Sequence, residues 1–191
     1  MSHSRASKSS VIQNPITVAG IPIPSDSPPF LAVLGVHVAA GLAAVSTGLL
    51  AMLSPKGRGR HSGRGTAYYW CLAVVFVTMS VLSIMRWTED YHLFVLGVLS
   101  FTAASIGRVA LRVRWEGWVR IHLSGMGLSY VLLLTAFYVD NGPNLPLWRE
   151  LPSITYWFLP SAVGLPLIIR ALVAHPLVRR SHDRAHPSGA L

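Results

Sequence analysis

Long uncharged stretches are the feature of this sequence that most restricts its fold. Between Phe30 and Pro55, and again between Gly65 and Met85, there is no Lys, Arg, Asp or Glu. The hydrocarbon core of a bilayer is roughly 30 Å thick and takes about 20 helical residues to cross, because a helix rises about 1.5 Å per residue. Each stretch is therefore long enough to span a membrane as a helix.

Further stretches of the same kind follow, each bounded by a charge, a proline or a glycine-rich link. Their apolar positions are continuous rather than alternating, and they are too few to close a barrel, so strands are excluded as the spanning form. Hydrophobic residues make up 52% of the chain and charged residues only 12%, which is unlike a water-soluble domain. We expect an all-α integral membrane protein whose first four helices form an antiparallel bundle, with spans at roughly 30–53, 66–86, 91–112, 119–139 and 153–173.

The sequence divides into three parts around these spans. Residues 1–28 are rich in serine and proline and have little to bury, so we expect a disordered segment. Residues 29–174 form the transmembrane domain, and the basic residues 175–191 form a predicted cytoplasmic tail near the membrane surface. The first span is too long for a signal peptide and lacks a small-residue cleavage pattern, so we expect it to be retained.

Positive charge predicts the orientation of the spans. One set of links carries Lys56, Arg58, Arg60, Arg64, Arg108, Arg112, Arg114, Arg120, Arg170, Arg179, Arg180 and Arg184. The opposite set carries Arg5, Lys8, Arg86 and Arg149 together with Asp26, Glu89, Asp90, Asp140 and Glu150. The positive-inside rule places the first set in the cytoplasm, with the N-terminus outside and the C-terminus inside. These arginines are also expected to contact anionic lipid head groups.

Three other classes of protein are disfavoured. The net charge of +9 could suggest nucleic-acid binding, but the arginines are divided among membrane flanks and no recognition motif accompanies them. Cys71 is the single cysteine and lies within a span, so there is no disulfide framework or thiolate metal site. No nucleotide loop, nucleophile triad or metalloprotease helix is present, so we do not expect a soluble type of enzyme.

Four of the eight histidines lie near the beginnings of the first four spans. Because neighbouring spans run in opposite directions, His37 and His92 are predicted in the outer half, and His61 and His122 towards the cytoplasm. Helical steps place the small residues Gly41, Ala44 and Gly48 on the same face as His37, which favours close helix contact on that face. His37 should therefore face the interior of the bundle, and His122 likewise lies on the more polar side of its helix.

The histidines suggest chemistry of several kinds. Two histidines that face each other across a bundle can hold a haem iron from both sides, so the outer pair and the inner pair would suit two stacked b-type haems that pass electrons across the bilayer. His37 lies roughly 10 Å below the start of its helix and His92 is near the surface, which opposes such a pairing. An outer zinc or copper site could combine His37 and His92 with Glu89, Asp90 or Asp140.

Two further interpretations stay open. His37 or His122 could titrate in a polar path for protons or a solute. The protein could instead be a regulatory or scaffolding membrane subunit in which the histidines are purely structural. Small-residue helix faces also serve contacts between chains, so a homo-oligomer or a membrane partner subunit is compatible with the sequence.

Three segments carry a resemblance to a known family. They are "HVAAGLAAVSTG" from residue 37, "KGRGRHSGRGTAYY" from residue 56 and "WVRIHLSGMGLSYVLLLTAFYVDNGPNLPLW" from residue 118. Over roughly residues 30–170 the chain resembles bacterial predicted membrane proteins grouped as domain of unknown function 2306, where an arginine often follows the link histidine directly and this chain has Ser62. The resemblance implies a small multi-helix protein of the bacterial inner membrane and no established activity.

Overall fold

The computed structural model describes residues 16–18, 21–23, 27–55, 59–146 and 148–174. A short antiparallel hairpin of strands β1 (Ile16–Val18) and β2 (Ile21–Ile23) comes first, and the other regular elements of the described residues are helical. The hairpin lies within the segment 1–28, most of which is outside the described residues. The predicted basic tail, residues 175–191, is also outside them.

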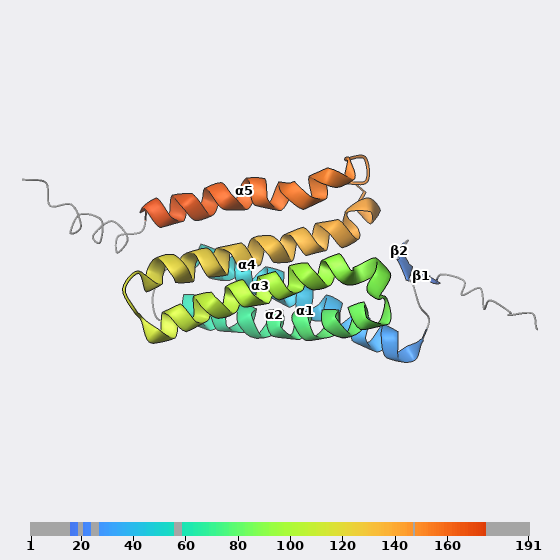
Figure 1. Cartoon of the computed structure of the whole chain (residues 1–191), viewed down its shortest axis with the longest axis horizontal. Coiled ribbons are helices and arrows are strands. Elements are labelled where there is room, and N and C mark those ends of the chain that lie inside the picture. The colour runs from blue at the N-terminus through green and yellow to red at the C-terminus, as the bar shows by residue number, and fades with distance from the viewer. Residues whose placement is uncertain (1–15, 19–20, 24–26, 56–58, 147, 175–191) are drawn as a thin grey trace, which may run out of the picture.

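Five helices are long and apolar enough to cross a membrane, as the sequence predicts. They are α1 (Pro28–Leu53), α2 (Arg60–Met85), α3 (Trp87–Val113), α4 (Trp118–Asn141) and α5 (Ser153–Ala174), with a 3-10 turn η1 (Gly142–Asn144) directly after α4. In Figure 1 the helices lie side by side as long rods, and the chain reverses its direction at each link. The successive spans therefore begin at alternate ends of the molecule.

Two helices begin earlier than the apolar runs that predict them. α2 begins at Arg60 rather than near residue 66, and α3 begins at Trp87 rather than near residue 91. An apolar run marks the part of a helix that needs lipid, whereas the helix itself can continue into the polar boundary. In α3 the first turn holds Glu89 and Asp90, whose negative charge is favourable beside the partial positive charge of a helix N-terminus.

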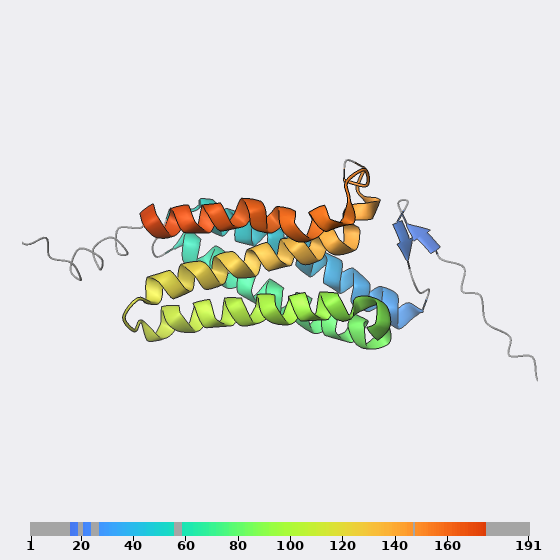
Figure 2. The ribbon, with the colours of Figure 1, turned by 45° about the horizontal axis from the view of Figure 1, so that its top comes forward.

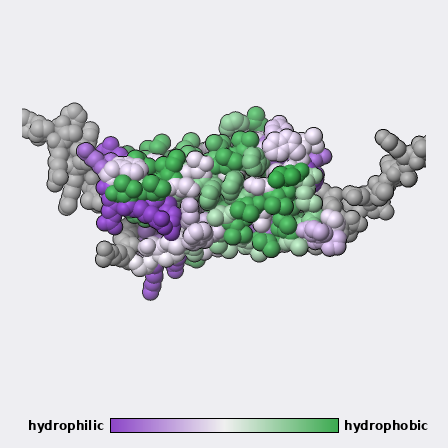
Figure 3. All heavy atoms as spheres, turned by 60° about the horizontal axis from the view of Figure 1, so that its bottom comes forward, coloured by the Kyte–Doolittle hydropathy of each residue, from purple (hydrophilic) through white to green (hydrophobic). Residues whose placement is uncertain are grey.

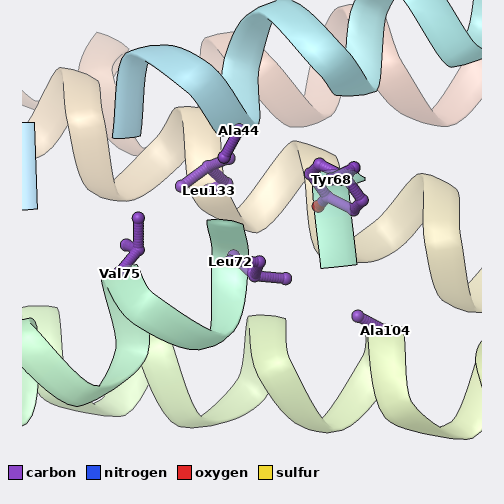
Figure 4. Close-up of a cluster of buried hydrophobic side chains, with 6 residues drawn as sticks. All are labelled: Ala44, Tyr68, Leu72, Val75, Ala104 and Leu133. Atoms are coloured by element: carbon purple, nitrogen blue, oxygen red, sulfur yellow. The ribbon is translucent and has the colours of Figure 1, made fainter. Parts of the chain in front are cut away.

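A hydrophobic core joins the first four helices. The buried cluster consists of Ala44, Tyr68, Leu72, Val75, Ala104 and Leu133, which come from α1, α2, α3 and α4 (Figure 4). Ala44 and Ala104 have no exposed surface. Small side chains at these positions allow the helix backbones to approach, and van der Waals packing then holds them together.

The closest approach of backbones occurs between α3 and α4. A Cβ atom added at Gly125 would lie 2.6 Å from the carbonyl oxygen of Ala103 and 3.0 Å from the Cα of Gly107. Both obstacles are main-chain atoms, which cannot rotate away as a flexible side chain can. Glycine at position 125 is therefore required by the spacing of the two helices.

Helix α5 packs on α4 and lies at the edge of the assembly (Figures 1 and 2). A Cβ atom at Gly164 would lie 2.2 Å from Cγ2 of Val131, so α5 meets α4 through a glycine. In the first turn of α5, the buried Tyr156 donates a hydrogen bond to the carbonyl oxygen of Trp148 at 2.7 Å. Only 6% of the most apolar part of α5 is buried, so most of its apolar surface is not covered by the other described residues.

Candidate functional site

The two ends of the helical assembly differ in charge. We call the basic end the one where α1, α3 and α5 finish and α2 and α4 begin, and the far end the opposite one. Described arginines at or near the basic end are Arg60, Arg64, Arg108, Arg112, Arg114, Arg120 and Arg170. In Figure 3 strongly hydrophilic atoms gather at this end, and hydrophobic atoms cover much of the middle of the visible face.

His61 lies at the start of α2 and connects it to the end of α1. Its Nδ1 donates a hydrogen bond to the carbonyl oxygen of Ala51 at 2.9 Å. The i+4 donor that would serve Ala51 in a continuing helix is absent because residue 55 is proline, so this carbonyl oxygen accepts from the N–H of Ser54 at 3.2 Å and has room for the imidazole as a second donor. The imidazole therefore helps to cap α1 from the neighbouring helix.

Arg64, one turn further along α2, strengthens the same junction. Its guanidinium donates to the hydroxyl of Ser54 at 2.7 Å and to the carbonyl oxygen of Leu50 at 3.2 Å. Ser54 is only 4% exposed. Two side chains at the start of α2 thus bind the polar groups left at the end of α1, and the basic link has a structural role beyond orientation.

His122 makes the corresponding contact between α3 and α4. Its Nδ1 donates to the carbonyl oxygen of Gly107 at 2.9 Å. Gly107 is buried and lies within α3, about two turns before the end of that helix. A carbonyl oxygen can only accept a hydrogen bond, so Nδ1 carries the hydrogen in both His61 and His122.

His37 faces the neighbouring helix α2, in agreement with the small-residue face that it shares. Its Nδ1 lies 2.9 Å from the hydroxyl oxygen of Thr78. The Thr78 hydroxyl also lies 2.8 Å from the carbonyl oxygen of Val74 in its own helix and can donate to it. His37 and Thr78 together form a polar contact between α1 and α2.

His92 lies at the far end, in the second turn of α3. Its ring centroid is 5.9 Å from that of Trp157 in α5, so the imidazole lies beside an aromatic ring. Asp140, at the end of α4, is within electrostatic range of His92, Asp90 and Arg86. Arg86 and Asp90 also form an ion pair with a nitrogen–oxygen distance of 3.6 Å.

The predicted ligands do not gather into a metal site. Within residues 27–55, 59–146 and 148–174 there is no group of three or more His, Cys, Asp or Glu side chains that could hold a metal ion. His37, His92 and Asp140 therefore do not form one. For the predicted haem ligands, the described interactions show Nδ1 of His61 and of His122 bonded to carbonyl oxygens, and Nδ1 of His37 bonded to a threonine hydroxyl.

Sequence reasoning missed a buried polar network at the centre of the bundle. The Tyr68 hydroxyl of α2 donates to the hydroxyl of Ser129 in α4 at 2.8 Å, and Ser129 in turn donates to the carbonyl oxygen of Met126. Ser100 of α3 donates to the carbonyl oxygen of Ser129 at 2.8 Å. The signal available in the sequence was the isolated serines within otherwise apolar spans, since polar groups inside a membrane seek partners on other helices.

It also missed two shallow grooves on the outer surface near the basic end. The first, about 350 Å³ in volume, lies between α3 and α4, and the second, about 380 Å³, follows α3 to the link before α4. The first is lined by Ala103, Ile106, Arg120, Ile121, Ser124, Gly125 and Leu128. None of the four predicted histidines lines either groove.

Comparison with known proteins gives no match to a family model, to a curated protein or to a solved structure. The resemblance to the family called domain of unknown function 2306 stays a prediction. The function must therefore be argued from the contacts of this chain alone.

Proposed function

We propose that this protein is a multi-pass membrane subunit that serves as a scaffold or regulatory partner, in which the histidines are structural. One observation carries the proposal: His61 and His122 each donate Nδ1–H to a main-chain carbonyl of the preceding helix. Side chains used in this way hold helix pairs together. We do not propose a catalytic activity.

In this proposal the first four helices form an antiparallel bundle in a bacterial inner membrane. The basic end faces the cytoplasm and the N-terminus lies outside, because arginine-rich links are retained on the cytoplasmic side. The concentration of arginines at one end of the described helices supports this orientation. Anionic lipid head groups are then the immediate neighbours of those arginines.

A scaffold must also offer a surface to another membrane helix or to a second copy. We place that surface on α1 and α5, the two helices that are least covered within the chain, with 11% and 6% of their most apolar parts buried. On α1, the space around Gly35 and Gly41 is open, with no atom within 4 Å of an added Cβ. Small residues of this kind allow a partner backbone to approach closely.

Absorption spectroscopy and metal analysis test whether the protein binds haem or a metal ion. The protein is purified after expression with ample haem, zinc and copper, and its spectrum is recorded before and after reduction. We expect no Soret band and less than one metal ion per chain. An intense Soret band that sharpens on reduction, and that is lost in both His61→Asn and His122→Asn, would overturn the proposal.

One observation favours the second candidate, a histidine-ligated haem or metal. Ligating histidines commonly donate their other ring N–H to a carbonyl oxygen, and His61 and His122 both make such a bond through Nδ1. Asparagine separates the two functions at these positions, since its amide can replace the Nδ1 donor but does not ligate haem iron. Retained stability in His61→Asn and His122→Asn with no spectral change supports the structural role.

A further inference from the structure

We propose that the two grooves near the basic end form a binding site for one anionic phospholipid, with its two acyl chains on either side of Ile106. This inference rests on the proposed membrane embedding of the bundle. It specifies one bound lipid, beyond general contact between the arginines and head groups. It also assigns a role to groove residues that take no part in the histidine contacts.

The first groove has the shape and chemistry of an acyl-chain site. Along α4 it is lined by Arg120, Ser124 and Leu128, which are spaced four residues apart and therefore share one face of the helix. From Arg120 to Leu128 the helix rises about 12 Å, from the basic end into the apolar zone. The groove thus begins at a cation and continues along apolar surface.

The floor of this groove follows from the close contact of α3 and α4. Gly125 and Ala103 bring the two backbones together and leave no bulky side chain between the helices. Ile106 and Leu128 stand beside them and are 51% and 41% exposed. A chain of methylene groups can lie over the small residues and contact the larger ones on each side, which provides many weak dispersion contacts.

The second groove lies on the other side of Ile106. It is lined by Phe101, Thr102, Ser105, Ile106, Val109 and Trp115. Trp115 follows α3 in the link at the basic end, and tryptophan is favoured where the apolar and polar layers of a membrane meet. Because Ile106 lines both grooves, their occupants would be neighbours.

Charge complementarity selects the occupant. The polar ends of the two grooves hold Arg120 and Trp115, and the link between α3 and α4 adds Arg114, next to Trp115 in the sequence. A guanidinium binds a phosphate group with charge-assisted hydrogen bonds. Two apolar grooves of about 350 Å³ and 380 Å³ that end at the same cationic link fit a two-chain phospholipid with a net negative head group.

Native mass spectrometry of the delipidated full chain in detergent measures the binding. Phosphatidylglycerol and phosphatidylcholine with identical chains are added in turn, and we expect one tightly bound phosphatidylglycerol per chain. Arg120→Gln should weaken that binding about tenfold, which is the loss expected for one charge-assisted contact. Ile106→Trp should weaken it by a similar factor, because the indole fills the space on both sides of position 106.

Two matched variants control for the loss of a positive charge and for the addition of a large side chain outside the grooves. Arg112→Gln removes an arginine from the same end without touching either groove, and Val95→Trp adds an indole at an exposed position of α3 outside both. Neither should change the affinity by more than about twofold. Equal losses in Arg112→Gln and Arg120→Gln would overturn the site in favour of a diffuse basic surface, and unchanged binding in Ile106→Trp would overturn the grooves.

Further measurements test whether the site binds a lipid phosphate or free phosphate. They also separate failure of this inference from failure of the proposed function. Inorganic phosphate should not displace phosphatidylglycerol, and full displacement by it would overturn a lipid site. Equal binding of the two lipids by a protein that remains in the membrane fraction would overturn the lipid site alone. A chain that remains soluble without detergent would overturn the membrane embedding on which both proposals depend.

Discussion

The two helical hairpins α1–α2 and α3–α4 use the same kind of contact at different depths. In each, a histidine near the start of the second helix donates Nδ1–H to a carbonyl oxygen of the first. The acceptor Ala51 lies in the last turn of α1, whereas the acceptor Gly107 lies about two turns before the end of α3, and both residues are buried. The first contact caps the end of a helix, and the second joins two helices away from the end of the acceptor helix.

The hairpins also differ in how closely their backbones approach. In α3–α4 an added Cβ at Gly125 meets main-chain atoms, whereas in α1 an added Cβ at Gly48 meets only side-chain atoms, of Tyr130 and Tyr68, and one at Gly41 meets nothing within 4 Å. The difference teaches that a small residue in a span does not by itself indicate close packing. The α3–α4 hairpin should therefore tolerate substitution less well than α1–α2.

The largest effect is expected for Gly125→Leu. The Cβ atom alone would lie 2.6 Å from the carbonyl oxygen of Ala103, so α3 and α4 must separate. Overpacking of this kind should lower the free energy of unfolding by about 3 kcal/mol. Unfolding in mixed detergent micelles measures it, with Gly41→Ala as the control that should change stability by less than about 0.5 kcal/mol. Equal effects of the two substitutions would refute the contrast between the hairpins.

The next effect is expected for His122→Ala compared with His61→Ala. Hydrogen bonds between membrane helices contribute on average about 0.6 kcal/mol and at most about 1.7 kcal/mol. We expect about 1.5 kcal/mol for His122, whose acceptor lies well inside α3, and about 0.5 kcal/mol for His61, whose acceptor lies in the last turn of α1 and keeps the N–H of Ser54 as a donor. The same micelle titration checks the order, and His122→Asn should recover most of the loss. A larger loss for His61 would reverse the comparison.

A smaller effect is expected for Tyr68→Phe, which removes a bond between the two hairpins. Tyr68 is 2% exposed and its hydroxyl donates to Ser129 at 2.8 Å. Loss of this bond should cost about 1 kcal/mol, because Ser129 keeps its own acceptor, Met126. Tyr130→Phe is the matched control: its hydroxyl donates to Val45 from a less buried position, at 3.1 Å, and should cost less. The melting temperature in detergent reports both.

The smallest effect is expected at the link between the hairpins. Arg86 and Asp90 form a partly buried ion pair at 3.6 Å at the far end. Pairs four residues apart contribute about 0.2–0.5 kcal/mol, so Asp90→Asn should lower stability by about that much. High salt should reduce the loss, since ions screen charges that are not fully buried. A loss above about 1 kcal/mol that persists in salt would assign a larger role to the far end.

Much of the fold follows from local sequence. Each span could be located because the need of about 20 apolar residues for a bilayer is a property of one segment and not of its neighbours. The start of α2 was misplaced because Arg60 and His61 are polar, yet they continue the helix and bind the end of α1. The small-residue face of His37 was also readable from helical spacing, and the bond to Thr78 agrees with it.

The candidate sites were harder to predict from the sequence than the helices. The positions of the histidines indicated that polar contacts should exist. A histidine can either ligate a metal or donate a hydrogen bond, so its presence in the sequence does not distinguish the two roles. The distinction depends on what each imidazole meets across a helix interface, such as the carbonyl oxygens of Ala51 and Gly107. The grooves beside Ile106 depend on the spacing of α3 and α4 and on the course of the link between them.

The sequence by itself determined that five segments can cross a membrane and that the arginines are concentrated in alternate links, since segment length and charge are counted along the chain. Only the tertiary structure decided which imidazole meets which carbonyl, why position 125 must be glycine and where the surface is hollowed. These features depend on the rotation of each helix about its axis and on the distance between axes. Both are set by packing among residues far apart in the sequence.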